Sequence, residues 1–558
     1  MQKTWKLRAL CPEGLAASLN LPPIVAQVLY NRNLASSELA RAFTSHAPAQ
    51  LHDPFLLPGI ERAVERLAQA IQRRETIGIF GDFDVDGVTA TTLLTQALEP
   101  LGVRVAPYIP HRVTEGHGLN SEAVSAMKKS GVSLLVTVDC GISSYDEVVQ
   151  AVDSGMDVII TDHHMPPPTL PPALALVDPK VPGSTYPFVE LTGAGLALKL
   201  IQGLYQSLDK PLPPSLIALA ALGTVADLAP LLDENRAIVK AGLVELRKTN
   251  NLGLQALYKR AGLRPQTLSA ESIAFGIAPR LNASGRVKHA EASFNLLNSR
   301  TESEAEALAQ EIEQYNYNRR KATDDAYALA LAKAPADLPP IILMVDESFS
   351  PGINGLVASR LAEEFYRPAI VMSPDEGLLR ASGRSIPDFD LVKALYQCQD
   401  LFSRVGGHPM AAGFVMEHGN LPALEERLLA AAHAQLKDLD LTPTLWVDAE
   451  APPHKLMGDC YRLLTTLEPF GAGNREPLFL ARGLRIDRSR AMGSQDQHLR
   501  FKLHDGRATW DAIAFRQGNG RLPETQRIDA VYCLKTDVWD GRQLLAMRLV
   551  DFRPSQSP

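Results

Sequence analysis

Short apolar runs alternate with helical patterns over residues 76–180. The runs are rich in β-branched residues and read TIGIFGD, VRVAPYIP, SLLVTVDCG, DVIITDHH and ALALVDP. This alternation predicts βαβ units around a mostly parallel sheet. Open α/β sheets place their ligands at the carboxyl ends of their strands. We therefore expect the polar residues that follow these runs to lie close together.

The pattern changes along the rest of the chain. Residues 1–75 are predicted to be mainly helical, 193–265 are helix-rich, and 302–333 form one long polar helix that connects two lobes. A strand–helix–strand alternation restarts near residue 338, and short alternating strands after residue 440 predict a small β-barrel. These changes predict an α/β chain divided into residues 1–75, 76–300, 301–337, 338–440 and 441–558.

The composition is ordinary for several globular domains, with 558 residues, 46% hydrophobic and 21% charged. A net charge of −7 does not indicate nucleic-acid binding, although bound cations would offset acidic residues locally. Five scattered cysteines without a paired spacing argue against a thiolate zinc site and fit a reducing compartment. The chain has no apolar run long enough for a membrane span and no signal-peptide pattern, so we expect a cytoplasmic protein.

Carboxylates and histidines gather where the predicted strands end. Three acids stand two residues apart in DFDVDG, and their mutual repulsion is costly unless a divalent cation neutralises them. Further candidate ligands follow in TVDCG, TDHH and GTVAD. The full set is Asp82, Asp84, Asp86, Asp139, Asp162, His163, His164 and Asp227.

These ligand types suit Mn²⁺ or Mg²⁺. Several of them around one crevice predict two ions about 3.5–4 Å apart, which is the arrangement that clamps a phosphate for in-line displacement. An isolated Asp-x-Asp is more often a calcium-loop fragment or a solvated turn, and an isolated His-His pair is more often structural. The combination, in this order, favours a metal-dependent enzyme that hydrolyses phosphoesters.

DFDVDG, VDCG, DHH and GTVAD resemble the motif series of the DHH phosphoesterases. The longer blocks IPHRVTEGHGLN, LTGAGLALKL, APRLNASGR, ASGRS, GGHPMAAG and LEPFGAGNREPLF are similar to those of family members that degrade single-stranded DNA. The resemblance implies a parallel-sheet DHH catalytic domain over 76–300 and a connector helix over 301–337. It further implies a DHH-associated α/β domain over 338–440 and an OB-like barrel over 441–558.

The resemblance also implies a role for each ligand. Asp82 and Asp84 would hold one ion, whereas Asp86, His163 and Asp227 would hold the other. Asp139 would bridge the two ions. His164 would contact the scissile phosphate or help to stabilise its developing charge, and Asp162 would orient His164. The family motif more often reads DYDxDG, and Phe83 replaces its tyrosine here without touching a ligand.

Candidate contacts to DNA lie in the later motifs. Small residues let backbone N–H groups approach a phosphate, and arginine offers two parallel donors. Arg112 is the candidate for contact with the 5′ end of the DNA substrate. The other candidates are Arg280, Asn282, Ser284 and Arg286 in APRLNASGR, and Ser382, Arg384, Gly406, Gly407 and His408 in the second α/β domain. In the barrel, Trp510, Phe515, Tyr532 and Trp539 could stack on bases, and Arg485, Arg488, Arg490 and Arg500 could supply charge.

The activity implied by the resemblance is a 5′→3′ exonuclease. It would be specific for single-stranded DNA, release 5′-mononucleotides and act in recombination and repair. We expect a monomer that excludes duplex DNA by the width of its cleft, with a helicase and a single-strand-binding protein as candidate partners. Two alternatives stay open, namely a DHH enzyme for a small substrate such as a dinucleotide, and a DNA-binding scaffold that has lost its metals.

Overall fold

A computed structural model of the chain describes residues 3–45, 51–112, 114–335, 337–493, 496–518, 526–539 and 542–555. The chain forms two compact units. Unit 1 contains 1–47, 442–470 and 474–558, and unit 2 contains 48–441 and 471–473. Among the described residues, no helix has both the length and the apolar character needed to cross a lipid bilayer.

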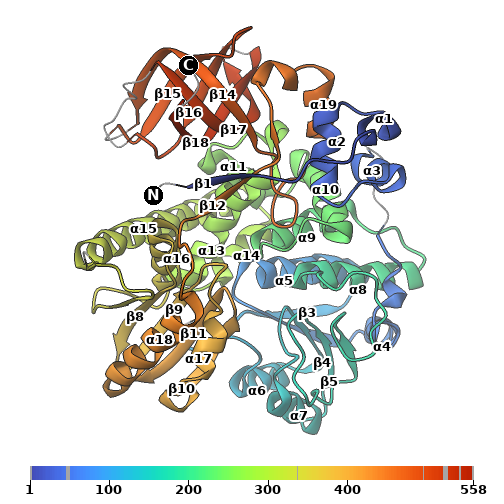
Figure 1. The fold of residues 1–558 in the computed structure, drawn as a ribbon. Coiled ribbons are helices and arrows are strands. Elements are labelled where there is room, and N and C mark those ends of the chain that lie inside the picture. Colours follow the sequence, from blue (N-terminus) through green and yellow to red (C-terminus); the bar gives the residue numbers. More distant parts are fainter. Residues whose placement is uncertain are drawn as a thin grey trace. The chain divides into compact units, whose positions relative to one another are not determined.

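Unit 2 contains the predicted parallel sheet (Figure 1). Its strands are β2 (Thr76–Gly81), β3 (Arg104–Tyr108), β4 (Val132–Val138), β5 (Asp157–Thr161) and β6 (Ala175–Val177). They lie in the order β3-β2-β4-β5-β6, and every neighbouring pair is parallel. The order changes direction between β2 and β4, so the DFDVDG and VDCG motifs both start at the topological switch point, where such sheets bind ligands.

The helix that follows β2 is buried on almost all sides. In α5 (Val85–Leu98), every residue except Gln96 is buried. Its four threonines remain compatible with this interior because each hydroxyl donates to the carbonyl four residues earlier. Helices α8 (Gly193–Ser207) and α9 (Pro214–Ala226) share the same hydrophobic core. This burial places the start of α5, with its acids, in a rigid environment.

Helix α8 is anchored by a fully buried ion pair. Lys199 Nζ lies 2.7 Å from Glu234 Oε1, and both side chains are inaccessible to solvent. The other carboxylate oxygen of Glu234 accepts a 2.6 Å hydrogen bond from the hydroxyl of Tyr186. Lys199 Nζ also donates to the carbonyl of His52. The pair therefore joins α8 to α10 (Asp233–Arg247) and to the segment before α4.

Lys199→Met should strongly destabilise the protein, because it leaves the Glu234 carboxylate buried without its charge partner. We expect a loss of about 3–5 kcal/mol in the free energy of unfolding. Urea denaturation followed by circular dichroism would measure it, with the exposed Lys210→Met as the matched control. Equal denaturation midpoints for the two variants would contradict the interpretation that the Lys199–Glu234 ion pair stabilises the fold.

The remaining elements of unit 2 include the long connector helix. α15 spans Glu302–Lys333, as the charge pattern predicts. The other helices are α4 (Ile60–Arg73), α6 (Ser121–Lys129), α7 (Tyr145–Asp153), α11 (Leu252–Ala261), α12 (Ala270–Ser272), α13 (Ala278–Val287), α14 (Glu291–Leu297), α16 (Asn354–Phe365), α17 (Leu391–Tyr396) and α18 (Leu421–Leu436). A π-helical turn, Ile273–Ile277, leads directly into α13.

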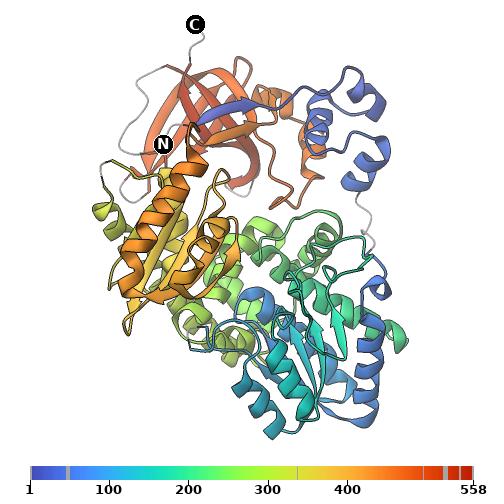
Figure 2. The same ribbon diagram turned by 60° about the horizontal axis from the view of Figure 1, so that its bottom comes forward.

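A second, mixed sheet follows α15. Its strands are β7 (Ile342–Val345), β8 (Ala369–Asp375), β9 (Leu378–Arg384), β10 (Phe402–His408) and β11 (Ala411–Glu417), in the order β10-β11-β9-β8-β7. Only β7 and β8, which flank α16, are parallel. Figure 2 shows α18 running along one face of this sheet, where Leu424 and Leu428 join its core. Leu379 and Ala381 of β9 belong to the same core, so Ser382 and Arg384, at the alternate positions, lie on the other face.

Unit 1 is built from both ends of the chain. β1 (Thr4–Leu7) pairs in parallel with β12 (Thr444–Val447). Its helices are α1 (Leu15–Leu19), α2 (Pro23–Tyr30), α3 (Ser37–Thr44) and α19 (Asp459–Thr465). Its other strands are β13 (Ala449–Glu450), β14 (Phe479–Met492), β15 (His498–His504), β16 (Thr509–Ala514), β17 (Arg527–Trp539) and β18 (Arg542–Pro554). β14 pairs with both β15 and β17, which closes a five-stranded barrel. The predicted fold class, two α/β parts, a long helix and a small barrel, is confirmed.

Candidate metal centre

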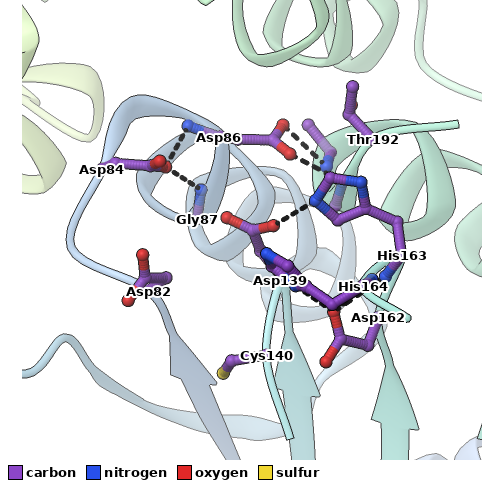
Figure 3. Close-up of polar contacts among 12 residues, drawn as sticks. Asp82, Asp84, Asp86, Gly87, Asp139, Cys140, Asp162, His163, His164 and Thr192 are labelled. Carbon is purple, nitrogen blue, oxygen red and sulfur yellow. Dashed lines mark hydrogen bonds and ion pairs between the residues drawn. The ribbon is translucent and has the colours of Figure 1, made fainter. Parts of the chain in front are cut away.

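The predicted ligands converge at the carboxyl end of the first sheet. Three groups have ligand atoms that all lie within 4.8 Å of one another, namely Asp82–Asp84–Asp139, Asp139–His163–His164 and Asp86–His163–Asp227. Asp139 and His163 each belong to two groups, so the three groups form one continuous centre. Figure 3 shows Asp86, Asp139 and His163 turned toward one another, with Asp82 and Asp84 on the side away from His163.

Two of the acids are held by helix N-termini. Asp84 is the N-cap of α5, and its Oδ1 accepts hydrogen bonds from the N–H groups of Asp86 and Gly87 at 2.9 and 3.2 Å. Asp86 accepts from the N–H groups of Gly193 and Ala194, at the start of α8, at 2.6 and 3.0 Å. Both carboxylates thereby face the positive ends of helices, which favours their ionised form.

Asp139 lies at the middle of the centre in a left-handed conformation, with φ at 62°. Its Oδ1 is 3.0 Å from Nε2 of His163. The backbone of α8 approaches it so closely that a Cβ on Gly193 would lie 2.8 Å from the Asp139 carboxyl carbon. A glycine is therefore required there, which gives a physical reason for the small residues in LTGAGLALKL.

Asp162 holds the DHH loop and is itself outside the three groups. Its Oδ1 accepts from the N–H of His163 at 2.8 Å and from Nδ1 of His164 at 2.7 Å, and its Oδ2 accepts from the N–H of Ile142 at 3.0 Å. In Figure 3 its carboxylate points away from the other acids. The structure therefore places Asp162 behind the histidines, in the position expected for a residue that orients them.

Asp227 reaches the centre from a helix, in the region 193–265 that we predicted to be helix-rich, although we also grouped it with the ligands that follow strands. It is the C-cap residue of α9. The run before it, SLIALAALGTVA, is rich in alanine and leucine, which favour helix over strand. We grouped it with strand ends because a short apolar run does not by itself distinguish a buried helix from a buried strand.

The acids repel one another in this buried position. Burial, followed by the charges of neighbouring acids, raises the pKa of Asp84 and raises the pKa values of Asp86 and Asp139 well above the ordinary range. The same causes raise the pKa of Asp227 to about 7. Burial lowers the pKa of His163 to about 3, while the hydrogen bond with Asp162 raises the pKa of His164 to about 9. Such a cluster fits cations that would neutralise it.

The ion-free protein should lose stability as the pH rises from 6.5 to 9. The pKa of His164 is raised from its ordinary value of 6.5 to about 9 in the folded state, so the stability that this group contributes at pH 6.5 is lost as the pH rises to 9. The raised pKa of Asp227, about 7, acts in the same direction but mostly below pH 7. The lowered pKa of His163 acts only below pH 6.5 and does not oppose this change. Thermal unfolding of EDTA-treated protein at the two pH values would measure it. Saturating Mg²⁺ should reduce the difference in unfolding temperature between pH 6.5 and pH 9. An ion-free protein that unfolds at a higher temperature at pH 9 than at pH 6.5 would contradict the prediction.

Arg112 and Arg286 lie near the acids, and Arg384 is a neighbour of both arginines. Arg112 stacks on the ring of Phe83, with its guanidinium carbon 4.7 Å from the ring centroid, and Asp82 and Asp84 are its acidic neighbours. Burial, then the charges of Arg112, Arg319 and Arg384, lower the pKa of Arg286 to about 9. We call Arg112, Arg286 and Arg384 the arginine cluster. Guanidinium groups this close favour an anion among them.

The other phosphate candidates differ in their surroundings. Arg280 is paired with Glu313 of α15 at 2.6 Å, and the hydroxyl of Ser284 is fully buried against Leu281 and Ser293. Neither is free to meet a substrate in this conformation. Asn282 is half-buried on α13, and Ser382 is half-buried on β9. Gly406, Gly407 and His408 are exposed at the end of β10, and His408 lies near enough to His163 to influence its charge.

The barrel aromatics divide into core and surface. Trp510 and Tyr532 are core residues whose polar atoms bond to Asp505 and to the carbonyl of Ala451, so they do not offer stacking surfaces. Phe515 is half-exposed, and the guanidinium of Arg548 lies 5.8 Å from its ring centroid. The side chain of Trp539 is outside the described residues. Arg488 and Arg490 are exposed, whereas Arg485 and Arg500 pair with Asp487 and Asp511.

The sequence did not lead us to two residues that contact the centre. Nδ1 of His117 lies 3.2 Å from Oδ2 of Asp82. Nζ of Lys180 donates to the carbonyl of His163 at 2.6 Å. The only available signal for His117 was its place between two glycines in EGHGLN, and Lys180 offered none, because a lysine after a strand is usually a solvated residue.

Comparisons with known proteins agree with this geometry. The DHH family N-terminal domain matches residues 76–224, the DHHA1 domain matches 338–438, and the RecJ OB domain matches 447–551. The single-stranded-DNA-specific exonuclease RecJ of Bacillus subtilis is 38% identical over 98% of this chain and 70% of its own length.

Solved structures give the same result. The crystal structure of RecJ from Thermus thermophilus in complex with Mn²⁺ matches 99% of this chain and 80% of its own, with a TM-score of 0.85 and 32% identity. The complex of RecJ from the same organism with Mg²⁺ matches with a TM-score of 0.79 and 30% identity, over 99% and 79% of the two chains. The extent and identity of these matches show that the chain belongs to the RecJ family.

Proposed function

We propose that this protein is a single-stranded-DNA-specific exonuclease that hydrolyses phosphodiester bonds at a two-ion centre. The observation that carries this proposal is the set of three ligand groups linked through Asp139 and His163. Family membership supplies the substrate class, because the relatives are named as single-stranded-DNA-specific exonucleases. The intact ligand set argues against the alternative of a scaffold that has lost its metals.

The residues present fit two divalent cations, Mn²⁺ or Mg²⁺. Oδ1 of Asp82 is buried and has no hydrogen-bond partner among the described residues, as expected of an atom that faces a cation. Asp82 and Asp84 would hold one ion, Asp86, His163 and Asp227 the other, and Asp139 both. When bound, the ions would supply a hydroxide from water and neutralise charge on the phosphate.

The protein's own groups position the substrate around that centre. His164 is half-exposed, and its hydrogen bond to Asp162 keeps the imidazole protonated near neutral pH, so it can stabilise charge that develops on the scissile phosphate. The arginine cluster would hold the 5′-terminal phosphate. Ser382 and the glycines before His408 would contact the following backbone. The 5′→3′ direction and the release of 5′-mononucleotides are what the family resemblance implies, and this proposed arrangement is compatible with them.

We propose the same division of labour for the domains as the sequence predicts. Residues 76–300 would form the catalytic domain, 301–337 the connector, 338–440 the substrate-binding domain and 441–558 a barrel that retains the strand. The mainly helical region 1–75 is divided, since 1–47 belongs to unit 1 and the rest to unit 2. Arg488, Arg490 and Phe515 are the barrel groups best placed for DNA. We further propose a cytoplasmic monomer that acts in repair and recombination with a helicase and a single-strand-binding protein.

Degradation of an 80-nucleotide single strand labelled at either end tests the activity and its direction. The expected result is early release of a 5′-labelled mononucleotide, with the 3′ label released last and a matched duplex left intact. Early release of the 3′ label would overturn the direction. Faster hydrolysis of a dinucleotide than of the long strand would instead favour the small-substrate alternative.

A further inference from the structure

We propose that Leu228 is a substrate contact whose side chain covers a base beside the scissile phosphate of single-stranded DNA. This inference rests on the proposed function and names an apolar contact that the predicted site lacks. Leu228 combines two features that each cost stability, namely a left-handed backbone and an exposed apolar side chain.

Leu228 occupies a backbone position that suits glycine. Helix α9 ends in a Schellman motif after its C-cap residue, Asp227. The N–H of Leu228 donates to the carbonyl of Val225 at 3.2 Å. The N–H of Ala229 donates to the carbonyl of Thr224 at 3.3 Å. The motif requires a left-handed residue, which is usually glycine because a Cβ is disfavoured there. Leu228 adopts this conformation with φ at 58°, and it is the only aliphatic residue among the described non-glycine residues with positive φ.

The fold gains little from the Leu228 side chain. Leu228 is 72% exposed, so little packing offsets the cost of its backbone. Its neighbour Ala229 is buried and already supplies an apolar contact after the helix end. A residue that is unfavourable in both backbone and side chain, and that directly follows a candidate metal ligand, is expected to serve the site rather than the fold.

Leu228 lies on the accessible side of the metal centre. Among the residues of the three ligand groups, only Asp227 and His164 are exposed, so a substrate can approach the centre from their side. The charges of these two groups interact, so they lie near each other. Each is followed by an exposed apolar residue, because Leu228 comes after Asp227 and Met165, 69% exposed, comes after His164. Two apolar side chains therefore border the side from which a phosphate would reach the centre.

The part of the substrate that fits this border is a base. A phosphodiester at the centre has one nucleoside on each side, so a base must lie close to it. Leucine and methionine side chains are uncharged and can cover the face of a base without reading its edge. In a duplex, a base beside an internal phosphodiester is stacked on its neighbours and paired. The contact is therefore open to an unstacked base, as a single strand provides.

The test combines a change in the protein with a change in the DNA. Leu228→Asn removes the apolar contact and keeps the turn, because asparagine tolerates the left-handed conformation. We expect it to lower kcat/KM on a 5′-phosphorylated single strand by about tenfold, which is within the range for burying one leucine side chain. A strand that is abasic at its first or at its second nucleotide should cost the parent a similar factor at one of these positions. At that position, Leu228→Asn should degrade the abasic and the normal strand at nearly the same rate, since the contact is already lost.

The control is Val244→Asn, at an exposed apolar residue of α10, and it should leave kcat/KM unchanged on every strand. Leu228→Met should keep most of the parent's rate because it keeps an apolar side chain. The unfolding temperature of Leu228→Asn in EDTA should be no lower than that of the parent. Leu228→Gly, which also suits the turn, repeats the test should Leu228→Asn fail to fold.

The outcomes separate this inference from the function on which it rests. An unchanged kcat/KM in Leu228→Asn, or an equal loss on the normal strand and on both abasic strands, would overturn the contact with a base. A weaker affinity for Mn²⁺ together with that equal loss would show that Leu228 orients Asp227 instead. A parent protein that releases no nucleotides from a single strand would overturn the proposed function itself.

Discussion

Asp139→Asn should abolish nuclease activity while making the ion-free protein more stable. Asp139 shares one ligand group with Asp82 and Asp84 and another with His163, which also belongs to the group proposed for the second ion, so we expect its loss to disturb both ion positions. Ion chemistry of this kind contributes several kcal/mol to the transition state, and we expect kcat to fall by roughly 10³-fold or more. The rate of nucleotide release from a 5′-labelled single strand at saturating Mn²⁺ measures the loss.

The opposite sign of the stability change distinguishes this prediction from simple misfolding. Burial and the charges of Asp86, Asp84 and Asp82 raise the pKa of Asp139, so its charged form is costly without ions. A neutral amide of the same shape removes that cost, and the unfolding temperature in EDTA should rise by a few degrees. The stabilisation that Mn²⁺ adds to the parent should largely disappear. Asp153→Asn, on the exposed end of α7, is the control and should change neither quantity. An EDTA unfolding temperature below that of the parent would contradict the prediction.

His164→Gln should lower kcat by about 10²–10³-fold, the range for losing one group that stabilises developing charge. Asp162 keeps His164 protonated, because their hydrogen bond raises its pKa to about 9, and glutamine cannot carry that charge. The effect should fall on kcat rather than on KM for DNA. Single-turnover degradation of a short labelled strand at varied DNA concentration separates the two parameters.

The affinity of His164→Gln for Mn²⁺ distinguishes the two possible roles of His164. His164 lies within ligand distance of Asp139 and His163, so a role as a ligand is the competing explanation. If His164 acts on the phosphate, His164→Gln keeps the parent's affinity for both Mn²⁺ ions. A loss of one ion together with the loss of kcat would assign His164 to the metal instead. His418→Gln, an exposed histidine of the second α/β part, should leave both measurements unchanged.

Much of the acidic centre was predictable because it depends on local pattern and on sheet topology. Asp82, Asp84, Asp86, Asp139 and His163 all follow predicted strands, and parallel strands bring such residues to one edge. Asp227 was identified in GTVAD, within a region predicted to be helix-rich, but it was also grouped with strand ends, since apolar runs of alanine and leucine suit either buried element.

The phosphate contacts were harder to predict because their environment depends on distant segments. Arg280 and Arg286 lie in one motif, yet Arg280 is neutralised by Glu313 on α15, while Arg286 faces Arg112 and Arg384. Sequence alone cannot distinguish an arginine that pairs with an acidic side chain from one that is available to bind a phosphate. The net charge of −7 likewise gives no sign of the arginine cluster, because it sums charges over the whole chain and says nothing of where they lie.

Unit 1 uses the first and last parts of the chain, and this has a consequence for biosynthesis. β1 cannot pair until β12 has left the ribosome, and Trp5 donates a 2.7 Å hydrogen bond to Asp551, 546 residues later. At about 5–20 residues per second, the wait amounts to roughly 20–90 s. Unit 2 is nearly continuous and can fold during that time. The apolar face of α2, which includes Val25, Val28 and Leu29, stays without its barrel partner through most of translation, so this early segment is exposed to aggregation until the barrel is made.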